Sequence, residues 1–103
     1  MSQSVFERIV EGTTPSHRLY EDDHVLALLD VGPISRGHCL LIPKTCYVEL
    51  DEVPADVAAA LGRALPRLVA AVKSATGCDG VNVLQNNGRV AGQVVMHVHF
   101  HLI

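Results

Sequence analysis

The chain ends in His97-Val98-His99-Phe100-His101-Leu102-Ile103, a stretch in which histidines alternate strictly with apolar residues. Side chains that follow one another along a β-strand point to opposite faces of the sheet, so the pattern predicts a strand whose three imidazoles share one side. The apolar residues between them are expected to face the core. Packing alone gives no reason for such a row, and its strict spacing indicates a functional site rather than unrelated structural histidines.

The loop before this stretch indicates the kind of ligand. It joins an expected strand at residues 80–86 to the expected final strand at 94–103, and it is rich in turn-forming residues: Asn86, Asn87, Gly88 and Gly92. Such residues allow tight turns in which backbone N–H groups point toward an anion, as in phosphate-binding nests. A glycine-rich loop alone would equally build an ordinary hairpin, but one that leads directly into a row of histidines favours a phosphate site.

The rest of the sequence predicts two helices and two more strands. Apolar residues at helical spacing follow Ser4, a suitable N-cap, and end at Gly12, which predicts a short helix. A long helix is predicted between Pro54 and Thr76, where one apolar face is formed by Val57, Leu61, Leu65, Leu68 and Val72. Strands are predicted at residues 24–30 and 38–44. The predicted strands follow one another with short links, and the helices are set apart from them, which predicts an α+β fold with an antiparallel sheet. We expect a single domain over residues 1–103.

Composition argues against several classes of protein. The 103 residues are 49% hydrophobic and 18% charged, which is typical of one globular domain. The net charge of −3, with neither a basic stripe nor a polybasic run, argues against binding to nucleic acid or to a membrane surface. Three cysteines without CxxC spacing predict neither a disulfide framework nor a cysteine-rich zinc site. Together with the lack of an apolar leader segment, they favour a cytoplasmic protein.

Two kinds of chemistry suit the histidine row. Imidazole is a common zinc ligand, but adjacent same-face positions on one strand lie about 7 Å apart, so three in a row fit one metal ion poorly. No carboxylate lies within the motif to complete a metal site. In the alternative, one neutral imidazole acts as a nucleophile while its neighbours bind anionic oxygen. The adjoining loop favours the second interpretation, and we expect neither a metal nor a cofactor.

The alternating stretch is similar to the histidine triad pattern that defines the HIT family of nucleotide hydrolases and transferases. Flanking segments resemble family segments in the family's order and extend the resemblance over nearly the whole chain: Tyr20-Glu21-Asp22-Asp23, Leu28-Leu29-Asp30, Gly37-His38, Ile42-Pro43-Lys44, Leu84-Gln85-Asn86-Asn87-Gly88 and Gly92-Gln93. The Hint-like branch, with its bacterial members, is the most similar. The resemblance implies a HIT-like fold, in which a roughly five-stranded antiparallel sheet accompanies one long helix and one or two short ones.

The resemblance also implies roles for individual residues. His99 would attack the α-phosphorus of a nucleotide, and water would then remove the nucleotidyl group. His97 and His38 would support this site by hydrogen bonding, while His101 would hold phosphate oxygens. Further substrate contacts would come from Asn86, Gly92 and Gln93 at the phosphate, from Asp30 at the ribose, and from Val5, Phe6, Ile9, Leu28 and Val31 around the base.

The activity implied is hydrolysis of nucleoside phosphoramidates, or of nucleoside 5′-phosphoesters such as dinucleoside polyphosphates, with a purine nucleotide as substrate. The alternative is a nucleotide-binding module or sensor with little turnover. The resemblance further implies a homodimer in which the long helices pack together and the two sheets join into one.

Several positions depart from the family's pattern. Ser4 and Glu7 stand where many members have a cysteine pair, and Cys46 stands where members often have a histidine two residues after Ile-Pro-Lys. A structural zinc is therefore not expected. Val94 replaces a serine or threonine whose hydroxyl assists the leaving group in relatives, which predicts a weaker phosphoramidase. Relatives continue beyond the motif into a segment that shapes substrate choice, whereas this sequence ends at Ile103.

Overall fold

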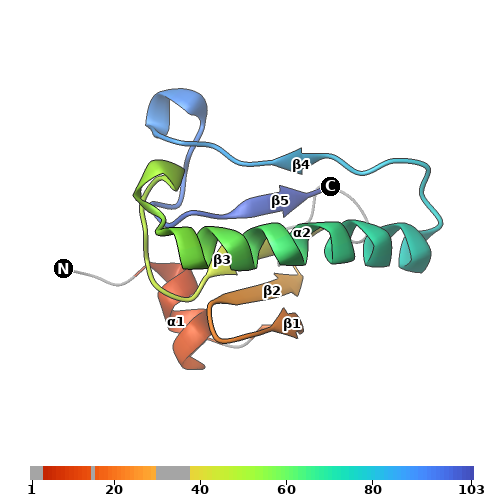
Figure 1. Ribbon diagram of the computed structural model, residues 1–103, viewed down its shortest axis with the longest axis horizontal. Coiled ribbons are helices and arrows are strands. Elements are labelled where there is room, and N and C mark those ends of the chain that lie inside the picture. Colours follow the sequence, from red (N-terminus) through yellow and green to blue (C-terminus); the bar gives the residue numbers. More distant parts are fainter. Residues whose placement is uncertain (1–3, 15, 30–37) are drawn as a thin grey trace.

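The computed structural model describes residues 4–14, 16–29 and 38–103. Five strands form one antiparallel sheet with a helix packed against each face, which confirms the predicted α+β class (Figure 1). The long helix runs along one face, and the short N-terminal helix packs against the other. Among the described residues, no helix combines the length and the apolar character that a membrane crossing needs.

The strands of the sheet are arranged in the order β1-β2-β3-β5-β4, and every neighbouring pair is antiparallel. Their bounds are β1 (Arg18–Glu21), β2 (Val25–Leu29), β3 (Cys39–Pro43), β4 (Val83–Leu84) and β5 (Phe100–Leu102). The apolar pattern does not predict β1, because three of its four side chains are exposed and show no alternation between buried and exposed positions. Its pairing with β2, rather than its composition, makes it a strand.

The last two strands are shorter than the sequence predicts. Of the strand expected at 94–103, only Phe100–Leu102 belongs to β5. Upstream of it the chain bends, and the Val98 N–H donates to the Tyr47 carbonyl, 2.7 Å away, instead of to a strand partner. The strand expected at 80–86 is likewise reduced to the two residues of β4. The alternation of polar and apolar residues indicates which way the side chains point here, but it does not indicate where hydrogen bonding to the neighbouring strand begins.

The central strands β2 and β3 are buried on both faces, which explains their nearly continuous apolar sequence. On one face, α2 (Ala55–Thr76) packs over alternate strand residues: Val25, Ala27, Cys39 and Leu41. On the other face, α1 (Val5–Glu11) packs over the intervening residues: Leu26, Leu28, Leu40 and Ile42. The sheet is therefore the middle of three layers. Two single turns of 3₁₀-helix, η1 (Leu50–Glu52) and η2 (Arg89–Ala91), lie in the connections.

Both helices have the ends that the sequence predicts, within one residue. In α1, the Ser4 hydroxyl accepts from the Glu7 N–H, and the Glu7 carboxylate accepts from the Ser4 N–H, which forms a complete capping box. Gly12 ends this helix in the left-handed region at φ 87°. In α2, Pro54 is the N-cap rather than the first helical residue, and Gly77 ends the helix at φ 68°.

The strand register decides which layer receives the histidines. Leu40 of β3 pairs with His101 of β5, and Leu41 pairs with Phe100. Paired residues project from the same face of a sheet, so His101 lies on the α1 side, whereas Phe100 packs against the core beneath α2. Leu102 is fully buried in that same core. The predicted separation of histidines and apolar residues onto opposite faces is therefore present in β5.

Candidate active site

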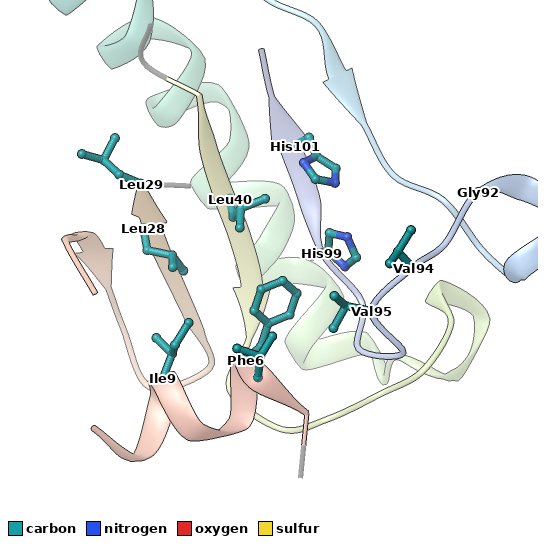
Figure 2. A pocket seen from close by; sticks show the side chains of 11 residues that line it. Phe6, Ile9, Leu28, Leu29, Leu40, Gly92, Val94, Val95, His99 and His101 are labelled. Atoms are coloured by element: carbon teal, nitrogen blue, oxygen red, sulfur yellow. The ribbon is translucent and has the colours of Figure 1, made fainter. Parts of the chain in front are cut away.

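His99 and His101 point into a pocket between the sheet and α1 (Figure 2). The centroids of their rings lie 4.9 Å apart, and the ring planes are inclined at 76°. Phe6 of α1 packs edge-on against both His99 and His97, with centroid distances of 5.0 and 5.6 Å. The first helix therefore meets the histidine row through Phe6, at the two histidines that precede β5.

One nitrogen of the His99 ring is bound to the backbone. Its Nδ1 lies 2.7 Å from the carbonyl oxygen of His97. A carbonyl oxygen can only accept a hydrogen bond, so Nδ1 carries a proton, and in the neutral ring the lone pair is on Nε2. The His99 residue as a whole is 8% exposed, and its ring lines the pocket. The neutral ring has the lone pair that a nucleophile requires.

His97 is fully buried and does not belong to the pocket lining. Its Nε2 lies 2.8 Å from the Pro43 carbonyl oxygen, and its Nδ1 lies 2.9 Å from the hydroxyl oxygen of Ser4. Because the carbonyl only accepts, Nε2 is the protonated nitrogen, and Nδ1 accepts from Ser4. Burial lowers the pKa of His97, although the hydrogen bond to Pro43 acts in the opposite direction. The ring is therefore held neutral with both nitrogens bonded.

His38 lies just before β3 and is also buried. Its Nε2 is 3.1 Å from Nδ1 of His101, and the two ring centroids are 5.3 Å apart. Two imidazole nitrogens in this contact share one proton, so one ring donates and the other accepts. The structure thus places His38 beside His101, at the opposite end of the row from His97.

The pocket has a volume of about 310 Å³ and largely apolar walls. Of the residues expected to contact substrate, it brings together Val5, Phe6, Ile9, Leu28, Gly92, His99 and His101. Asp30 and Val31, expected at the ribose and the base, lie outside the described residues.

Four further residues line the pocket: Leu29, Leu40, Val94 and Val95 (Figure 2). Val94 is expected from the sequence only as a departure from the family's pattern, and the other three are not predicted to belong to the site. An apolar strand residue that lines a pocket has the same local pattern as one that lies in the core, so no sequence signal separated them. Val94 is 84% exposed at the pocket rim, where it offers a side chain without a proton to donate.

The loop between β4 and β5 is closed by its own hydrogen bonds. The Gly88 N–H donates to the side-chain oxygen of Gln93 at 2.7 Å, and the Gln93 N–H donates to the Gly88 carbonyl at 3.1 Å. The Gln93 side-chain amide also donates to the carbonyls of Val48 and Val95, at 2.6 and 3.1 Å. With 3% of its surface exposed, Gln93 braces the loop from inside.

Gly92 lines the pocket, whereas Asn86 and Gln93, which were also expected to contact substrate, do not. The Asn86 side-chain nitrogen lies 3.5 Å from the Gly92 carbonyl oxygen. Gly92 has φ 97°, a left-handed conformation that residues with a Cβ rarely adopt, and a Cβ there would lie 3.6 Å from that nitrogen. The loop therefore needs glycine at this position for its backbone geometry, whatever its ligand.

One group of side chains has the composition of a metal site. Glu7, Cys46 and His97 offer ligand atoms that all lie within 4.8 Å of one another. Structural zinc sites are almost always four-coordinate, with thiolate and imidazole ligands, whereas this group offers one carboxylate, one thiol and one imidazole. Burial and the nearby charge of Glu7 raise the pKa of the Cys46 thiol, which disfavours the thiolate that zinc requires.

Each of these three side chains also has a hydrogen-bond partner within the protein. The Glu7 carboxylate accepts from the Ser4 N–H at 2.9 Å, and the Cys46 thiol donates to the Met96 carbonyl at 3.6 Å. Nδ1 of His97 accepts from the Ser4 hydroxyl. The residues at this position therefore do not fit the structural zinc of the family.

Comparison with known proteins links this fold and site to one family. The HIT domain family matches residues 11–103. A crystal structure of a HIT family member from Bacillus subtilis superposes with a TM-score of 0.94 at 39% sequence identity, covering 99% of this chain and 72% of that one.

Two named relatives are similar over 96% of this chain. Adenylylsulfatase HINT3 of Arabidopsis thaliana is 48% identical over 99 residues, and this chain spans only 50% of its length. Adenosine 5′-monophosphoramidase hnt1 of Schizosaccharomyces pombe is 46% identical over 99 residues, and this chain spans 71% of its length. The family match includes the histidine row and the loop that precedes it.

Proposed function

Because the chain belongs to the HIT domain family, we propose that it is a nucleotide hydrolase whose nucleophile is Nε2 of His99. The observation that carries this proposal is the 2.7 Å contact between Nδ1 of His99 and the His97 carbonyl, since it leaves the lone pair on Nε2. The names of the two relatives point to adenylyl sulfate and adenosine monophosphoramidate as substrates of those proteins. For this chain we propose nucleoside phosphoramidates or nucleoside 5′-phosphoesters, including dinucleoside polyphosphates.

The reaction has two displacements at phosphorus. In the first, the Nε2 lone pair of His99 forms a bond to the α-phosphorus, and the leaving group departs with the electron pair of the broken bond. The resulting nucleotidyl imidazole is cationic, and the His97 carbonyl stabilises it through the Nδ1 hydrogen bond. In the second, water attacks phosphorus, the P–N bond breaks, and the electron pair returns to Nε2. A nucleoside monophosphate leaves the site.

The neighbouring groups divide the binding of substrate among them. We assign the donor role in the His38–His101 contact to Nε2 of His38, so that Nδ1 of His101 accepts and the proton of the neutral His101 ring lies on Nε2. That Nε2–H can donate to a phosphate oxygen beside His99, because the centroids of the His99 and His101 rings are 4.9 Å apart. We assign the phosphate side to the loop that contains Asn86 and Gly92, with Gln93 acting as its internal brace.

The apolar half of the pocket suits a purine base, because Phe6, Ile9 and Leu28 bring flat or branched apolar surfaces together there. The role of Asp30 at the ribose and that of Val31 at the base belong to the same proposal and rest on the resemblance to the family. Among the described residues, the polar side chains in the pocket lining are His99 and His101, so the phosphate end and the base end are chemically distinct.

Substitution of the nucleophile tests the proposal. His99→Ala should lower the rate of AMP release from adenosine 5′-phosphoramidate by a factor on the order of 10³ or more, as is usual when a nucleophile is removed. Chromatographic assay of AMP measures the rate, and His17→Ala, at an exposed histidine outside the pocket lining, serves as the matched control. Quenched wild-type protein should carry a nucleotidyl mass increment on His99. Equal rates for wild type and His99→Ala would exclude the mechanism.

We also propose that the protein is a cytoplasmic homodimer. Its three cysteines are free, which suits a reducing compartment. β4 lies at the edge of the sheet, and both of its residues carry exposed apolar side chains. A strand from the sheet of a second copy could pair with the outer side of β4 and cover these side chains. α2 lies across one face of the sheet and carries apolar residues that are only partly buried there, such as Leu65, Val69 and Val72 (Figure 1).

A further inference from the structure

The N-cap of α1 is bonded directly to the first histidine of the row. We propose that Ser4 is a positioning residue, whose hydroxyl holds α1 and His97 together in the place where the family's pattern puts a metal. This inference deepens the proposed function, because α1 forms a wall of the pocket beside His99. Ser4 itself is not part of the pocket lining and acts through His97 and through the helix that it caps.

The hydrogen bonds around Ser4 allow only one arrangement of protons. Nε2 of His97 donates to the Pro43 carbonyl at 2.8 Å, so Nδ1 of the neutral ring can only accept. The Ser4 hydroxyl, 2.9 Å away, is therefore the donor. The same oxygen accepts from the Glu7 N–H at 3.0 Å, as an N-cap does. The Ser4 hydroxyl thus donates one hydrogen bond to His97 and accepts one from the first turn of α1.

Two routes carry the effect of this hydrogen bond to His99. The His97 carbonyl accepts from Nδ1 of His99, so the position of His97 sets the orientation of the nucleophile. Phe6, two residues after Ser4, packs against the His99 ring at 5.0 Å and lines the pocket. α1 has only seven residues, too few to persist without tertiary contacts, so its position depends on its attachments. Loss of the Ser4 donor should therefore disturb the pocket wall before it disturbs the sheet.

The same arrangement competes with a metal ion. Nδ1 of His97 is bonded to Ser4, whose N–H donates to Glu7, and Nε2 is bonded to Pro43. The Ser4 proton therefore occupies the lone pair that His97 would offer to an ion held with Glu7 and Cys46. An ion could bind this nitrogen only by displacing that proton, and Ser4 would then lose its partner. The proposal therefore predicts that the protein folds and binds nucleotide without zinc.

Three substitutions of Ser4 distinguish the hydrogen bond that it donates to His97 from the one that it accepts as the N-cap of α1. Ser4→Thr keeps both functions, and Ser4→Ala removes both. Ser4→Asp keeps a good N-cap, but a carboxylate cannot donate a proton to Nδ1. We expect the KM for adenosine 5′-phosphoramidate to rise about fivefold in the Ala and Asp variants, as for one lost hydrogen bond. We expect kcat to change less, and Ser4→Thr to stay within about twofold of wild type in KM.

A spectroscopic measurement reports on the hydrogen bond itself. Nitrogen-15 spectra of the imidazoles should show Nδ1 of His97 unprotonated in wild type and Ser4→Thr, and protonated in Ser4→Asp, where the carboxylate accepts from it. This measurement does not depend on turnover. If wild type proved inactive, the proposed function would fail, while the spectra, together with calorimetry of AMP binding, would still decide the role of Ser4.

Two results would overturn the inference. One is a Ser4→Asp protein with the wild-type KM and an unprotonated Nδ1 on His97. The other is one equivalent of zinc in the purified wild-type protein whose removal by a chelator weakens AMP binding, since a metal would then hold His97 instead of Ser4.

Discussion

Two histidines of the row differ in the hydrogen-bond partners of their ring nitrogens. His97 has both ring nitrogens bonded to the protein, so it is a structural group held in one tautomer. His99 has one nitrogen bonded to the backbone, and its other nitrogen is the reactive one in the proposed mechanism. In the proposed mechanism, identical side chains two residues apart therefore have different roles because different nitrogens of their rings are bonded to carbonyls.

The burial of His97 predicts a dependence of stability on pH. Its pKa in the folded protein is lowered from 6.5 by burial, so the unfolded chain takes up a proton first as the pH falls. The stabilisation is fully present above pH 6.5 and is lost as the pH falls through 6.5 toward the lowered pKa, with a slope of at most about 1.4 kcal/mol per pH unit. Urea unfolding between pH 7.5 and about 5.5 should therefore show a shallower loss in His97→Asn than in wild type.

The control for this experiment is His17→Gln, since His17 is exposed and its backbone hydrogen bond to Leu29 survives the change. Its slope should match that of wild type. A His97→Asn slope as steep as that of wild type would mean that another group causes the pH dependence.

At the scale of elements, α1 depends on attachments at both of its ends. Ser4 holds its beginning, and Arg18 of β1 holds its end, where Nη2 donates to the carbonyls of Ile9 and Val10 at 2.7 and 3.3 Å. The other guanidinium nitrogen of Arg18 pairs with Glu21 at 3.0 Å, which orients the side chain. β1, the strand that the apolar pattern does not predict, therefore helps to position a wall of the pocket.

Removal of the Arg18 contacts should loosen α1. We expect Arg18→Gln to lower the free energy of unfolding by about 1 kcal/mol, the usual contribution of such hydrogen bonds, and to raise the KM. Urea denaturation and steady-state kinetics measure the two effects. Arg8→Gln, at an exposed arginine of α1 itself, should change both by much less. If Arg8→Gln and Arg18→Gln behaved alike, general charge rather than this attachment would be responsible.

At the scale of the whole molecule, the two edges of the sheet differ. β1 forms one edge and carries charged residues, whereas β4 at the other edge consists only of Val83 and Leu84, which are 42% and 49% exposed. Charged side chains discourage pairing between sheets, and short apolar edges permit it. The β4 edge is therefore the one through which we expect two copies to join.

Equilibrium sedimentation at micromolar concentration tests the dimer. Wild type should have twice the monomer mass, and Leu84→Lys should shift it toward monomer because it places a charge at the joined edge. Leu19→Lys is a matched control, since Leu19 on β1 is also 49% exposed but lies at the opposite edge. A wild-type protein that sediments as a clean monomer would refute the proposed homodimer.

Much of the local structure followed from pattern alone. The N-cap at Ser4, the long helix between Pro54 and Thr76 and the opposite directions of His101 and Phe100 were all predictable, because caps and periodicity act between residues close in the chain. The length of β5 was not predictable in this way, because the start of a ladder depends on the strand beside it.

The features that depend on distant segments were decided by tertiary structure. Leu40 became part of the pocket only through its pairing with His101, and Ser4 meets His97 across 93 positions of sequence. No local pattern encodes such contacts, because they arise when register and packing bring separate segments together. Thus the alternating histidines, and the contact of His99 with the carbonyl two residues before it, belong to one short segment, whereas both partners of the His97 ring came from the packing of α1 and β3 around it.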